Sequence, residues 1–594
     1  MVDESGNIEI IAEKSDRKLR HKLGTIDLLF LSLGGIIGSG WLFAAYGASY
    51  VAGPGAIISW IIGGVIVIFI ALNYSELGTM IPRSGSIVRY GQYSHGNLAG
   101  FFFGWAYFLS AVSVPAIEAE AVVTYASSYY PGLTNGVVLT GTGILFAALL
   151  MILFFFLNYF GVRLMGKTNT GMTWWKLVIP FSTVILLIAV GFNMGNFNLS
   201  YTSTNSAFGP VGHTFSGFFP YGFGPVMAAV AVSGIVFSFL GFRQGLDYAG
   251  EAKNPQKSIP IATVIAVVIG IILYVLLQTA LIGSLRWGSL GVAPGNWHGL
   301  DTSLGVYLNG SGQYIGPQGL SALAGAPFAI LAQSFGLVFL TYVLFADAYI
   351  SPSGTLNVYL GTSMRTLYGL GTIGFLPRAF IKVHERWRVP VAPLLASLLI
   401  GFIFFIPFPS WYKMVGFITS STVFTYMVGG PAVRIFRKHA KELKRPFTLA
   451  GSKILSPLAF IGASLIVYWT GWPIDLYLLI AVYIGIFIVY PILYSLKLND
   501  KKIFDRTSVK AGIWVPIYMA ILTFMTYIGS FGGKSYIPFP WDLVVVVIIS
   551  IIFYFWAVYS GYRTEEIDTI IKENSQFLAS DEGVFEKEPD KGVS

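Results

Sequence analysis

Two apolar segments of the chain are interrupted by small residues that could leave backbone groups free to bind a ligand. The interruption at 34–40 reads Gly-Gly-Ile-Ile-Gly-Ser-Gly, and the one at 238–245 reads Ser-Phe-Leu-Gly-Phe-Arg-Gln-Gly. Each glycine disfavours a helix by about 1 kcal/mol relative to alanine. In hydrocarbon, freed backbone groups are tolerated only where they are buried in protein or line a cavity. Interruptions at matching positions of two halves indicate the substrate site of a transporter.

The helix ends beside these interruptions suit a dipolar ligand. A half-helix that begins near Ser39 and Gly40 would present its N–H groups, and this positive end suits a carboxylate. A half-helix that ends near Phe237 and Ser238 would present carbonyl oxygens, which suit an ammonium group. An anion site beside a cation site predicts an α-amino acid as the ligand. Chance alignment of two glycine-rich stretches is the alternative, since glycine is frequent in membrane helices.

Ionisable side chains inside membrane segments mark functional sites by default. Lys176 lies in the fifth apolar segment, where burial can let an ammonium load and release protons; the alternative is that it snorkels to the interface. Asp347, in the eighth segment, could couple protons or partner a cation, with a structural ion pair as the alternative. Three hydroxyl side chains could line the same spot or simply pack there: Ser351, Ser353 and Thr355.

Two acidic residues lie in the third segment. Glu118 and Glu120 point about 200° apart on a helix, so at most one of them can face a substrate path. We expect Glu118 to take part in proton coupling, and the other carboxyl must pair or meet water. A structural ion pair is the alternative for each.

Arg243 stands at the end of the second interruption. A guanidinium can grip a carboxylate bidentately. If Arg243 faces the cavity it would bind an acidic side chain, which makes aspartate or glutamate a candidate substrate. The alternative is a pair with Asp247 one turn later on the same helix.

Other residues are candidates for gates. Glu76 is close in sequence to Arg83 and Arg89, which predicts a salt bridge at the inner gate; a plain interfacial acid is the alternative. Among the aromatic residues near the interruptions, Phe239 is the one we expect to close over the substrate. Others could do the same, or pack: Trp41, Phe43, Phe237 and Phe242.

Composition makes the chain a polytopic membrane protein. Of its 594 residues, 55% are hydrophobic and 11% are charged, whereas soluble domains carry about 25% charge. It has no cysteine, which excludes thiol catalysis, disulfides and iron–sulfur ligation. Runs of about 20 apolar residues can cross a bilayer. The sequence predicts fourteen such spans: 25–49, 55–79, 98–127, 137–157, 170–194, 223–250, 259–284, 326–360, 390–408, 412–433, 455–472, 474–496, 511–530 and 541–562.

The distribution of basic residues predicts the orientation of these spans. With the N-terminus inside, 32 of the 37 Lys and Arg residues fall on one side. This asymmetry places both termini of a multi-pass cell-membrane protein in the cytoplasm. The net charge of +9 is therefore a topology signal, and it argues against nucleic acid as a partner.

The spans divide into two inverted units followed by extra helices. Five crossings are an odd number, so a second unit of five is inverted, and both interruptions then fall in the first span of a unit. The sequence predicts a cytoplasmic tail, two repeats, four additional spans and an acidic cytoplasmic tail: 1–23, 24–195, 223–440, 455–562 and 563–594.

Several motifs resemble the amino acid–polyamine–organocation (APC) superfamily of permeases. They occur in the right order over about the first 440 residues; spans eleven to fourteen match nothing comparable. The first four are Gly35-Ile-Ile-Gly-Ser-Gly40, Tyr74-Ser-Glu-Leu-Gly-Thr-Met-Ile-Pro-Arg-Ser-Gly85, Ser238-Phe-Leu-Gly-Phe with Ala249-Gly-Glu-Ala-Lys-Asn-Pro255, and Ser363-Met-Arg-Thr-Leu-Tyr368 with Gly374-Phe-Leu-Pro377. A further segment, Thr173-Trp-Trp-Lys-Leu-Val-Ile-Pro180, looks like the lysine-bearing fifth helix of some members.

The resemblance implies an all-α, LeuT-like five-plus-five inverted repeat that imports amino acids or related cations, commonly coupled to protons. It implies that the Lys176 ammonium stands where sodium-driven relatives bind sodium, so sodium coupling is the weaker alternative. It places substrate contacts at Ile37, Gly38, Ser39, Gly40, Phe237, Ser238, Phe239 and Gly241.

Other functions remain as alternatives. An amino acid exchanger or a polyamine permease would use the same fold. A membrane-embedded enzyme is disfavoured because the chain has no HExxH pair and no Walker A loop, and a channel because it has no repeated filter. A nutrient receptor is a further alternative. We expect no metal and no cofactor, and the sequence carries no signal for an oligomeric state.

Overall fold

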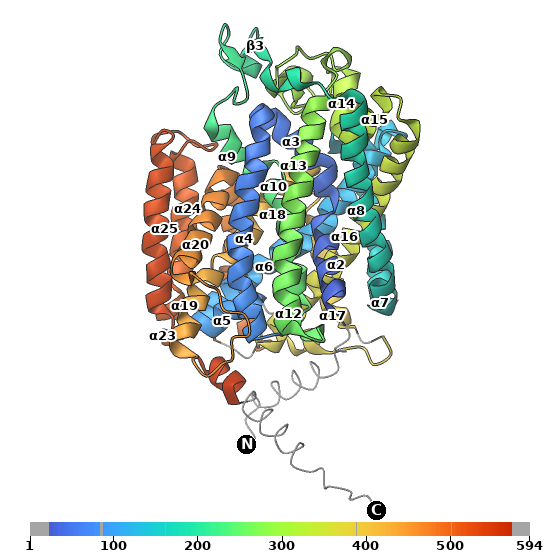
Figure 1. The fold of residues 1–594 in the computed structure, drawn as a ribbon. Helices are drawn as coiled ribbons and strands as arrows, with labels where there is room; N and C mark the ends of the chain where they lie inside the picture. The colour runs from blue at the N-terminus through green and yellow to red at the C-terminus, as the bar shows by residue number, and fades with distance from the viewer. Residues whose placement is uncertain (1–22, 84–86, 161, 388, 500–501, 573–594) are drawn as a thin grey trace, which may run out of the picture.

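The computed structural model describes residues 23–83, 87–160, 162–387, 389–499 and 502–572. The predicted tails lie largely outside these residues, as do Ser84 and Gly85 of the second motif. The described chain is a bundle of helices that stand roughly parallel to one another (Figure 1).

The first predicted unit forms a broken helix followed by long helices. The broken helix consists of α2 (Thr25–Ile36) and α3 (Ser39–Ala52), and a short helix, α5 (Ile87–His95), lies between the second and third long segments. The remaining helices are α4 (Ala56–Met80), α6 (Asn97–Ala126), α7 (Gly141–Phe160) and α8 (Val162–Gly191).

The first interruption is formed by Ile37 and Gly38. Gly38 has φ −116° and ψ −143°, outside the helical region, and the next residue begins α3. The prediction of a break within 34–40 is therefore confirmed. Because the glycines before it, Gly34 and Gly35, remain in α2, only two residues are unwound.

The second predicted unit also opens with a broken helix. Its elements are α9 (Phe223–Val232), α10 (Ile235–Phe239), the 3₁₀ turn η5 (Leu240–Arg243), α11 (Gln244–Asp247), α12 (Pro255–Pro260), the π-helical turn η7 (Ile261–Ile265), α13 (Ala266–Ser284), α14 (Gln318–Gly325), α15 (Pro327–Ser334), α16 (Val338–Thr372), α17 (Val391–Ile403), α18 (Trp411–Tyr426) and α19 (Gly429–His439).

The second break lies earlier than the sequence predicts. The helix bends by 49° between α9 and α10, where Gly234 has a φ of 88°. Residues 238–245 form helical and 3₁₀ turns, so the prediction that they unwind is wrong. The αL conformation favours glycine, and Gly234 adopts it, whereas Gly241 allows close packing. The carbonyl end of α9 is therefore at Val232, and not near Phe237 and Ser238 as predicted.

The eighth predicted span, 326–360, is also displaced. Gly336 has a φ of 71° after α15, and α16 begins at Val338 and continues to Thr372. A glycine with positive φ ends one helix here and lets the next one start in a new direction.

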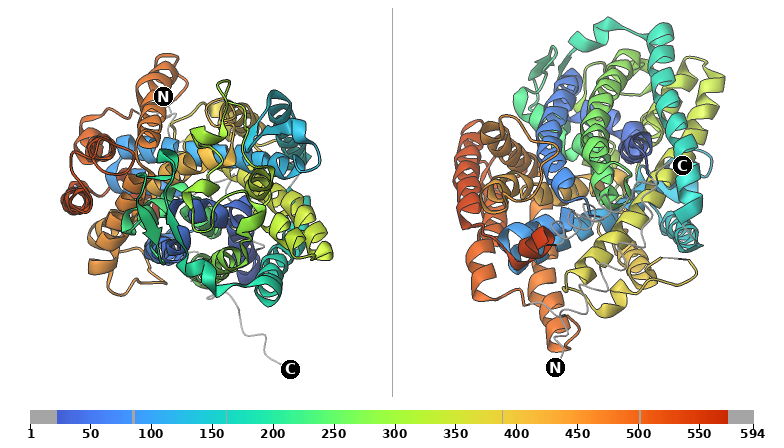
Figure 2. Two further views of the ribbon diagram at one scale, coloured as in Figure 1. Left: turned by 90° about the horizontal axis from the view of Figure 1, so that it is seen from above. Right: turned by 60° about the horizontal axis from the view of Figure 1, so that its bottom comes forward.

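The last part of the chain packs as a separate layer beside the first two units. Figure 2 shows these helices, coloured orange to red, along one flank of the bundle. The layer meets the first two units through α20, which packs against α4 and α18. The elements are α20 (Ser452–Thr470), α21 (Ile474–Ile484), the π-helical turn η12 (Gly485–Val489), α22 (Tyr490–Ser495), α23 (Arg506–Gly512), α24 (Trp514–Ile528) and α25 (Trp541–Ser560).

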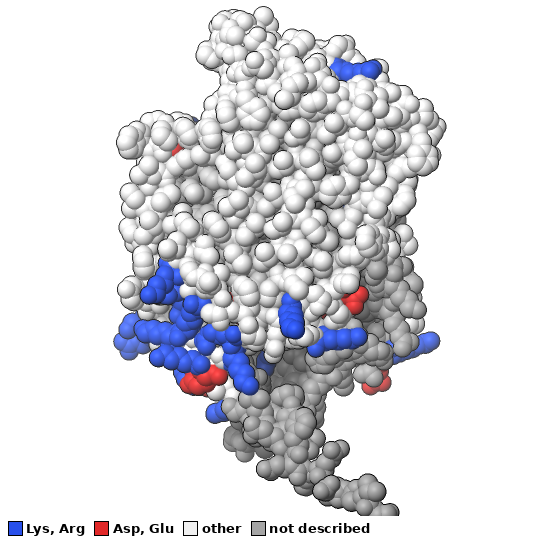
Figure 3. All heavy atoms as spheres, viewed as in Figure 1, with Lys and Arg blue, Asp and Glu red and all other residues white. Residues whose placement is uncertain are grey.

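Short hairpins lie at one end of the bundle. Strand β1 (Thr134–Asn135) pairs with β2 (Val138–Leu139), and β3 (Ser200–Thr202) pairs with β4 (Thr214–Ser216), both antiparallel. Figure 1 places β3 at the top of the molecule. Basic side chains gather at the opposite end (Figure 3). We call this end the basic face; its exposed residues include Lys257, Lys438, Lys441, Lys444 and Lys510.

The helices have the length and apolarity of membrane spans. Within the described ranges, nine helices can cross a bilayer, or ten when the bent pair α9–α10 counts as one span. The prediction of an all-α membrane protein is confirmed, while fourteen spans and the inverted repeat stay predictions. Helix α6 is almost completely buried and packs against α16 and α18, so it forms the centre of the bundle.

Candidate functional site

The two broken helices meet near the middle of the bundle. A Cβ added at Gly40 would lie 2.2 Å from Ser238 Oγ, so α3 and α10 are in direct contact there. A Cβ added at Gly241 would lie 2.1 Å from the carbonyl carbon of Gly35 and from Ile36 N. These glycines allow backbone to approach backbone, and they bring together residues that are about 200 positions apart in sequence. We call the space around the unwound residues Ile37 and Gly38 the gap.

A buried tyrosine that carries no local signal in the sequence joins the two broken helices. Tyr274, on α13, donates a hydrogen bond to Ile36 O at 2.7 Å and stacks on Trp60 with a centroid distance of 4.6 Å. Phe239 packs edge-on against both rings. Phe239, at the end of α10, therefore packs against α4 and α13, and its role as a gate stays a prediction.

The start of α3 holds the carboxylate of Glu118. Ser39 N donates a hydrogen bond to Glu118 Oε2 at 2.9 Å, and the other oxygen, Oε1, makes no hydrogen bond. Gly38 leaves room for this carboxylate, because a Cβ there would lie 2.8 Å from Glu118 Oε1. A carboxylate at the positive end of a helix is stabilised by the N–H groups and the helix dipole. This helix end is the one predicted to hold a substrate carboxylate.

Of the two acidic residues on α6, only Glu118 contacts the gap through a hydrogen bond. Glu120 is buried, and neither of its carboxylate oxygens makes a hydrogen bond with any residue that the structure describes. The opposite directions of the two side chains follow from the helix geometry.

Lys176 contacts the end of α2. Its Nζ donates to Gly34 O at 2.8 Å and to Thr355 Oγ1 at 2.9 Å. The side chain is buried, so the alternative of a lysine that snorkels to the interface is wrong. Within the described residues Lys176 has no carboxylate within ion-pair distance. It therefore stands as a cation at the negative end of one half-helix, while Glu118 stands at the positive end of the next.

Asp347 lies beside this pair and is fully hydrogen-bonded. It accepts hydrogen bonds from Trp41 Nε1 at 3.1 Å, Trp175 Nε1 at 2.8 Å and Ser351 Oγ at 2.6 Å. These donors come from α3, α8 and α16, so Asp347 connects three helices around the gap. Ser351 and Thr355 both take part in this polar cluster.

A second residue missed by the sequence reasoning covers the gap on the side away from the basic face. Trp411, the first residue of α18, donates to Ser39 Oγ at 2.8 Å and stacks on Phe43 with a centroid distance of 5.2 Å. Phe237 packs against the same indole. Trp411 also fills the bend, since a Cβ at Gly234 would lie 2.5 Å from its ring. An aromatic residue at the start of a span is usually read as an interfacial anchor.

Arg243 lies on the other side of the gap, toward the basic face. It is buried, and its guanidinium stands over the rings of Tyr107 at 4.7 Å and Tyr359 at 4.9 Å. Its Nη1 donates to Ser110 Oγ at 3.2 Å. The alternative of an ion pair with Asp247 is not formed, because Asp247 instead accepts from the Tyr107 hydroxyl at 2.6 Å.

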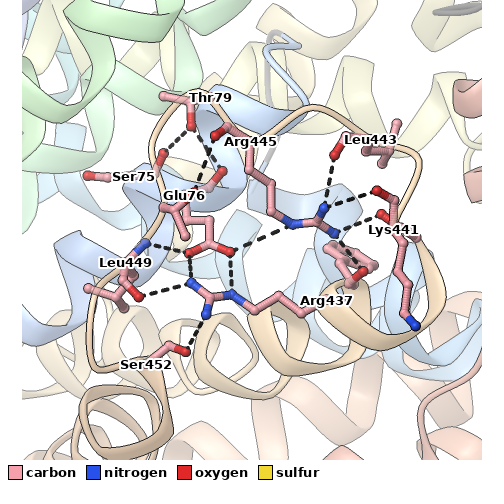
Figure 4. Close-up of polar contacts among 12 residues, drawn as sticks. Ser75, Glu76, Thr79, Arg437, Lys441, Leu443, Arg445, Leu449 and Ser452 are labelled. Carbon is pink, nitrogen blue, oxygen red and sulfur yellow. Dashed lines mark hydrogen bonds and ion pairs between the residues drawn. The ribbon is translucent and has the colours of Figure 1, made fainter.

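Glu76 forms an ion-pair cluster near the basic face (Figure 4). Its carboxylate accepts from Arg437 Nε at 2.8 Å and Nη2 at 2.5 Å, and from the backbone N–H of Leu449 at 2.7 Å. Arg445 Nε lies 4.0 Å away. The cluster ties α4 to α19 and to the segment before α20. Glu76 thus forms a salt bridge, as predicted, but with Arg437 and not with the arginines near it in sequence; Arg89 instead reaches Thr372 on α16.

Several known proteins are similar in sequence to this chain over most of its length. A model of the amino acid permease family matches residues 23–487. The glutamate/serine transporter AimA of Bacillus subtilis is 39% identical over 571 residues, which covers 94% of this chain and 98% of the relative. The aspartate-proton symporter of the same organism is 32% identical over 551 residues, covering 92% and 98%. Its branched-chain amino acid permease BcaP is 25% identical over 508 residues, covering 82% and 96%.

A helical membrane protein with two broken helices in contact is a secondary transporter in architecture. The chain belongs to the amino acid permease family. The family predicted from the motifs is thereby confirmed, and with it a multi-pass permease that is not an enzyme.

Proposed function

We propose that this permease imports amino acids together with protons by alternating access around the gap. The observation that carries the proposal is the hydrogen bond from Ser39 N to Glu118. The α-carboxylate of a substrate needs the same donor at the start of α3, so substrate and Glu118 compete for it. Relatives named as a glutamate/serine transporter and an aspartate-proton symporter support amino acids and protons as the cargo.

The competition gives a route to coupling. Two carboxylates at one helix end repel each other, so a bound substrate favours the protonated form of Glu118. A proton taken up with the substrate restores the charge balance beside Lys176. When the substrate leaves, Glu118 returns to the Ser39 N–H and releases its proton. Asp347, held by two indoles and a hydroxyl, is the second candidate in this exchange.

Sodium is the weaker coupling ion because Lys176 fills the polar position at the end of α2. Its ammonium bonds Gly34 O and Thr355 Oγ1, and these oxygens are the kind of ligands a sodium ion would use. The Lys176 ammonium, with its three N–H donors, thus occupies the position where a sodium ion would bind.

The substrate contacts belong to the same proposal. Ile37, Gly38, Ser39 and Gly40 line the gap from α2 and α3. Phe237, Ser238, Phe239 and Gly241 face it or pack beside it from α10 and η5. Because α9 ends at Val232, we place the group that binds the substrate ammonium among the oxygens around the gap and not at the predicted helix end.

The orientation follows from the basic face. We infer that this face is cytoplasmic, since Lys and Arg are enriched on cytoplasmic loops, and that both termini are there, in a chain of fourteen spans with two inverted units. Glu76, Arg437 and Arg445 then lie at the inner entrance, where they join α4 to α19.

Purified protein in liposomes tests the proposal. A panel of labelled amino acids is offered with and without an inward pH gradient, and with sodium replaced by potassium. We expect saturable uptake that the pH gradient drives above equilibrium and that sodium does not change. Uptake driven by sodium alone, or exchange that ignores both gradients, would contradict proton symport.

A further inference from the structure

Arg243 is a buried cation that forms no ion pair with any described residue. In the described part of the chain no carboxylate lies within 4.0 Å of its guanidinium, and the exposed fraction of the residue is 0%. It contacts the rings of Tyr107 and Tyr359 and the hydroxyl of Ser110, and Tyr426 and Asp247 lie nearby. A charge removed from water needs a partner charge or a full set of hydrogen bonds. Arg243 has neither.

Several polar atoms around Arg243 also lack partners. Arg243 Nε and Nη2 make no hydrogen bond, although both are buried. Within the described residues, the same holds for neighbouring polar atoms on α11 and α18: Gln244 Nε2, Asp247 Oδ1 and Tyr426 OH. Buried polar groups are satisfied in most proteins, so an unsatisfied cluster that includes a free edge of a guanidinium points to a ligand. We call this cluster the inner chamber; it consists of Tyr107, Ser110, Arg243, Gln244, Asp247, Tyr359 and Tyr426.

The inner chamber lies within one to two helical turns of the gap. On α16, Tyr359 is four residues beyond Thr355, which is about 6 Å along the helix axis; on α6, Ser110 is eight residues before Glu118, which is about 12 Å. The two carboxyl carbons of glutamate are four C–C bonds apart, so they can be separated by up to about 5 Å, and the hydrogen bond at each end adds further reach. A glutamate whose α-carboxylate is held at Ser39 can therefore direct its side chain toward Arg243.

We propose that the inner chamber binds the side-chain carboxylate of an acidic amino acid, and that Arg243 is the residue that selects for it. This inference rests on the proposed function, because it places the α-carboxylate in the gap. The free edge formed by Nε and Nη2 offers two parallel N–H donors, which matches a carboxylate. The tyrosine rings hold the guanidinium from its faces and leave that edge open. Asp247 accepts a hydrogen bond from the Tyr107 hydroxyl and forms no ion pair with Arg243. The Nε and Nη2 groups of Arg243 therefore stay available to the substrate carboxylate.

The test compares three substrates in liposomes: L-glutamate, L-glutamine and L-serine. Glutamate and glutamine have the same shape, so their ratio isolates the side-chain charge. We expect Arg243→Gln to lower kcat/KM for glutamate by about 10- to 100-fold, the size of a lost charged hydrogen bond. Serine and glutamine uptake should change by less than about 3-fold. Arg506→Gln, at an exposed site on α23, is the matched control and should change none of them.

The outcomes separate this inference from the proposed function. If the wild type takes up no amino acid with protons, the proposed function fails. If the wild type takes up serine but not glutamate, or if Arg243→Gln lowers all three substrates equally, only the inner chamber is overturned. Competition between chloride and glutamate would assign the chamber to an inorganic anion and would also overturn it. If Arg243→Gln does not yield folded protein, Tyr359→Leu removes one ring below the guanidinium, and a loss confined to glutamate is expected again; an equal loss for all three rejects the inference.

Discussion

Ser39 and Glu118 form a hydrogen bond between the unwound start of α3 and the centre of α6, with Ser39 N donating to Glu118 Oε2 at 2.9 Å. This bond occupies the helix end that would otherwise attract any anion. The protein thus holds its own carboxylate where a substrate carboxylate must arrive. In such a carrier, substrate binding changes the hydrogen bonding and the protonation of Glu118.

Glu118→Gln should uncouple transport from protons. The amide oxygen can still accept from Ser39 N–H, but it cannot take up a proton at neutral pH. We expect accumulation driven by a pH gradient to fall at least about 10-fold, while counterflow of labelled substrate at equal pH continues. Glu120→Gln is the matched control, since Glu120 lies two residues away and makes no hydrogen bond; it should keep its coupling. Loss of coupling in both variants would contradict the role given to Glu118.

Lys176→Met should have a similar effect for a different reason. The methionine keeps most of the buried stem, but the bonds from Nζ to Gly34 O and Thr355 Oγ1 are lost. Without this cation the charge of Glu118 is no longer balanced, so uptake should lose its dependence on pH. Lys257→Met, at an exposed site on α12, should behave as the wild type. The measurement is initial uptake rate against external pH; an unchanged profile for Lys176→Met would count against proton coupling through this residue.

Gly241→Ala should damage the contact between the two broken helices. The new methyl group would lie 2.1 Å from the backbone of Gly35 and Ile36, and backbone atoms cannot move aside as a side-chain end can. We expect a loss of stability of about 2 kcal/mol or more, in line with overpacking, and no measurable uptake. Gly171→Ala, with nothing within 4 Å of the new atom, is the control. Thermal unfolding of both purified variants checks this; equal midpoints would show that the contact is absent.

Glu76→Gln should weaken the cluster shown in Figure 4. The carboxylate makes three hydrogen bonds, two of them to Arg437, and a charged hydrogen bond contributes about 1.5–3 kcal/mol. We expect a lower unfolding midpoint together with faster efflux from loaded liposomes, because α4 and α19 separate more easily. Glu442→Gln breaks an exposed pair with Arg563 and should change neither. An efflux rate in Glu76→Gln equal to that of the wild type would contradict a role for this cluster as an inner gate.

Local sequence chemistry predicted part of this site. The cluster of glycines at 34–40 located the first break, and the buried ionisable residues Glu118, Lys176 and Asp347 lie close together around it. Such features can be predicted from sequence because unwound backbone and charged side chains are energetically unfavourable inside a membrane, so they occur mainly at functional sites.

The other features of the site depend on contacts between residues far apart in the chain, and these contacts cannot be predicted from local patterns in a single sequence. Gly234 and Gly241 are both glycines of the sixth predicted span, and nothing local tells which takes the αL conformation and which contacts a neighbouring backbone. The partners of Glu76 lie more than 360 positions away, on α19 and in the segment before α20. Trp411 and Tyr274 belong to helices without breaks or charges at those positions, so their contacts with Ser39 and Ile36 had no local signal.

The most direct test is an experimental structure of the protein with its transported amino acid bound. We expect a substrate carboxylate oxygen within hydrogen-bond distance of Ser39 N, with Glu118 displaced from that donor and the ligand enclosed between α3, α10 and α6. A ligand bound elsewhere, with the bond between Ser39 N and Glu118 intact, would contradict it.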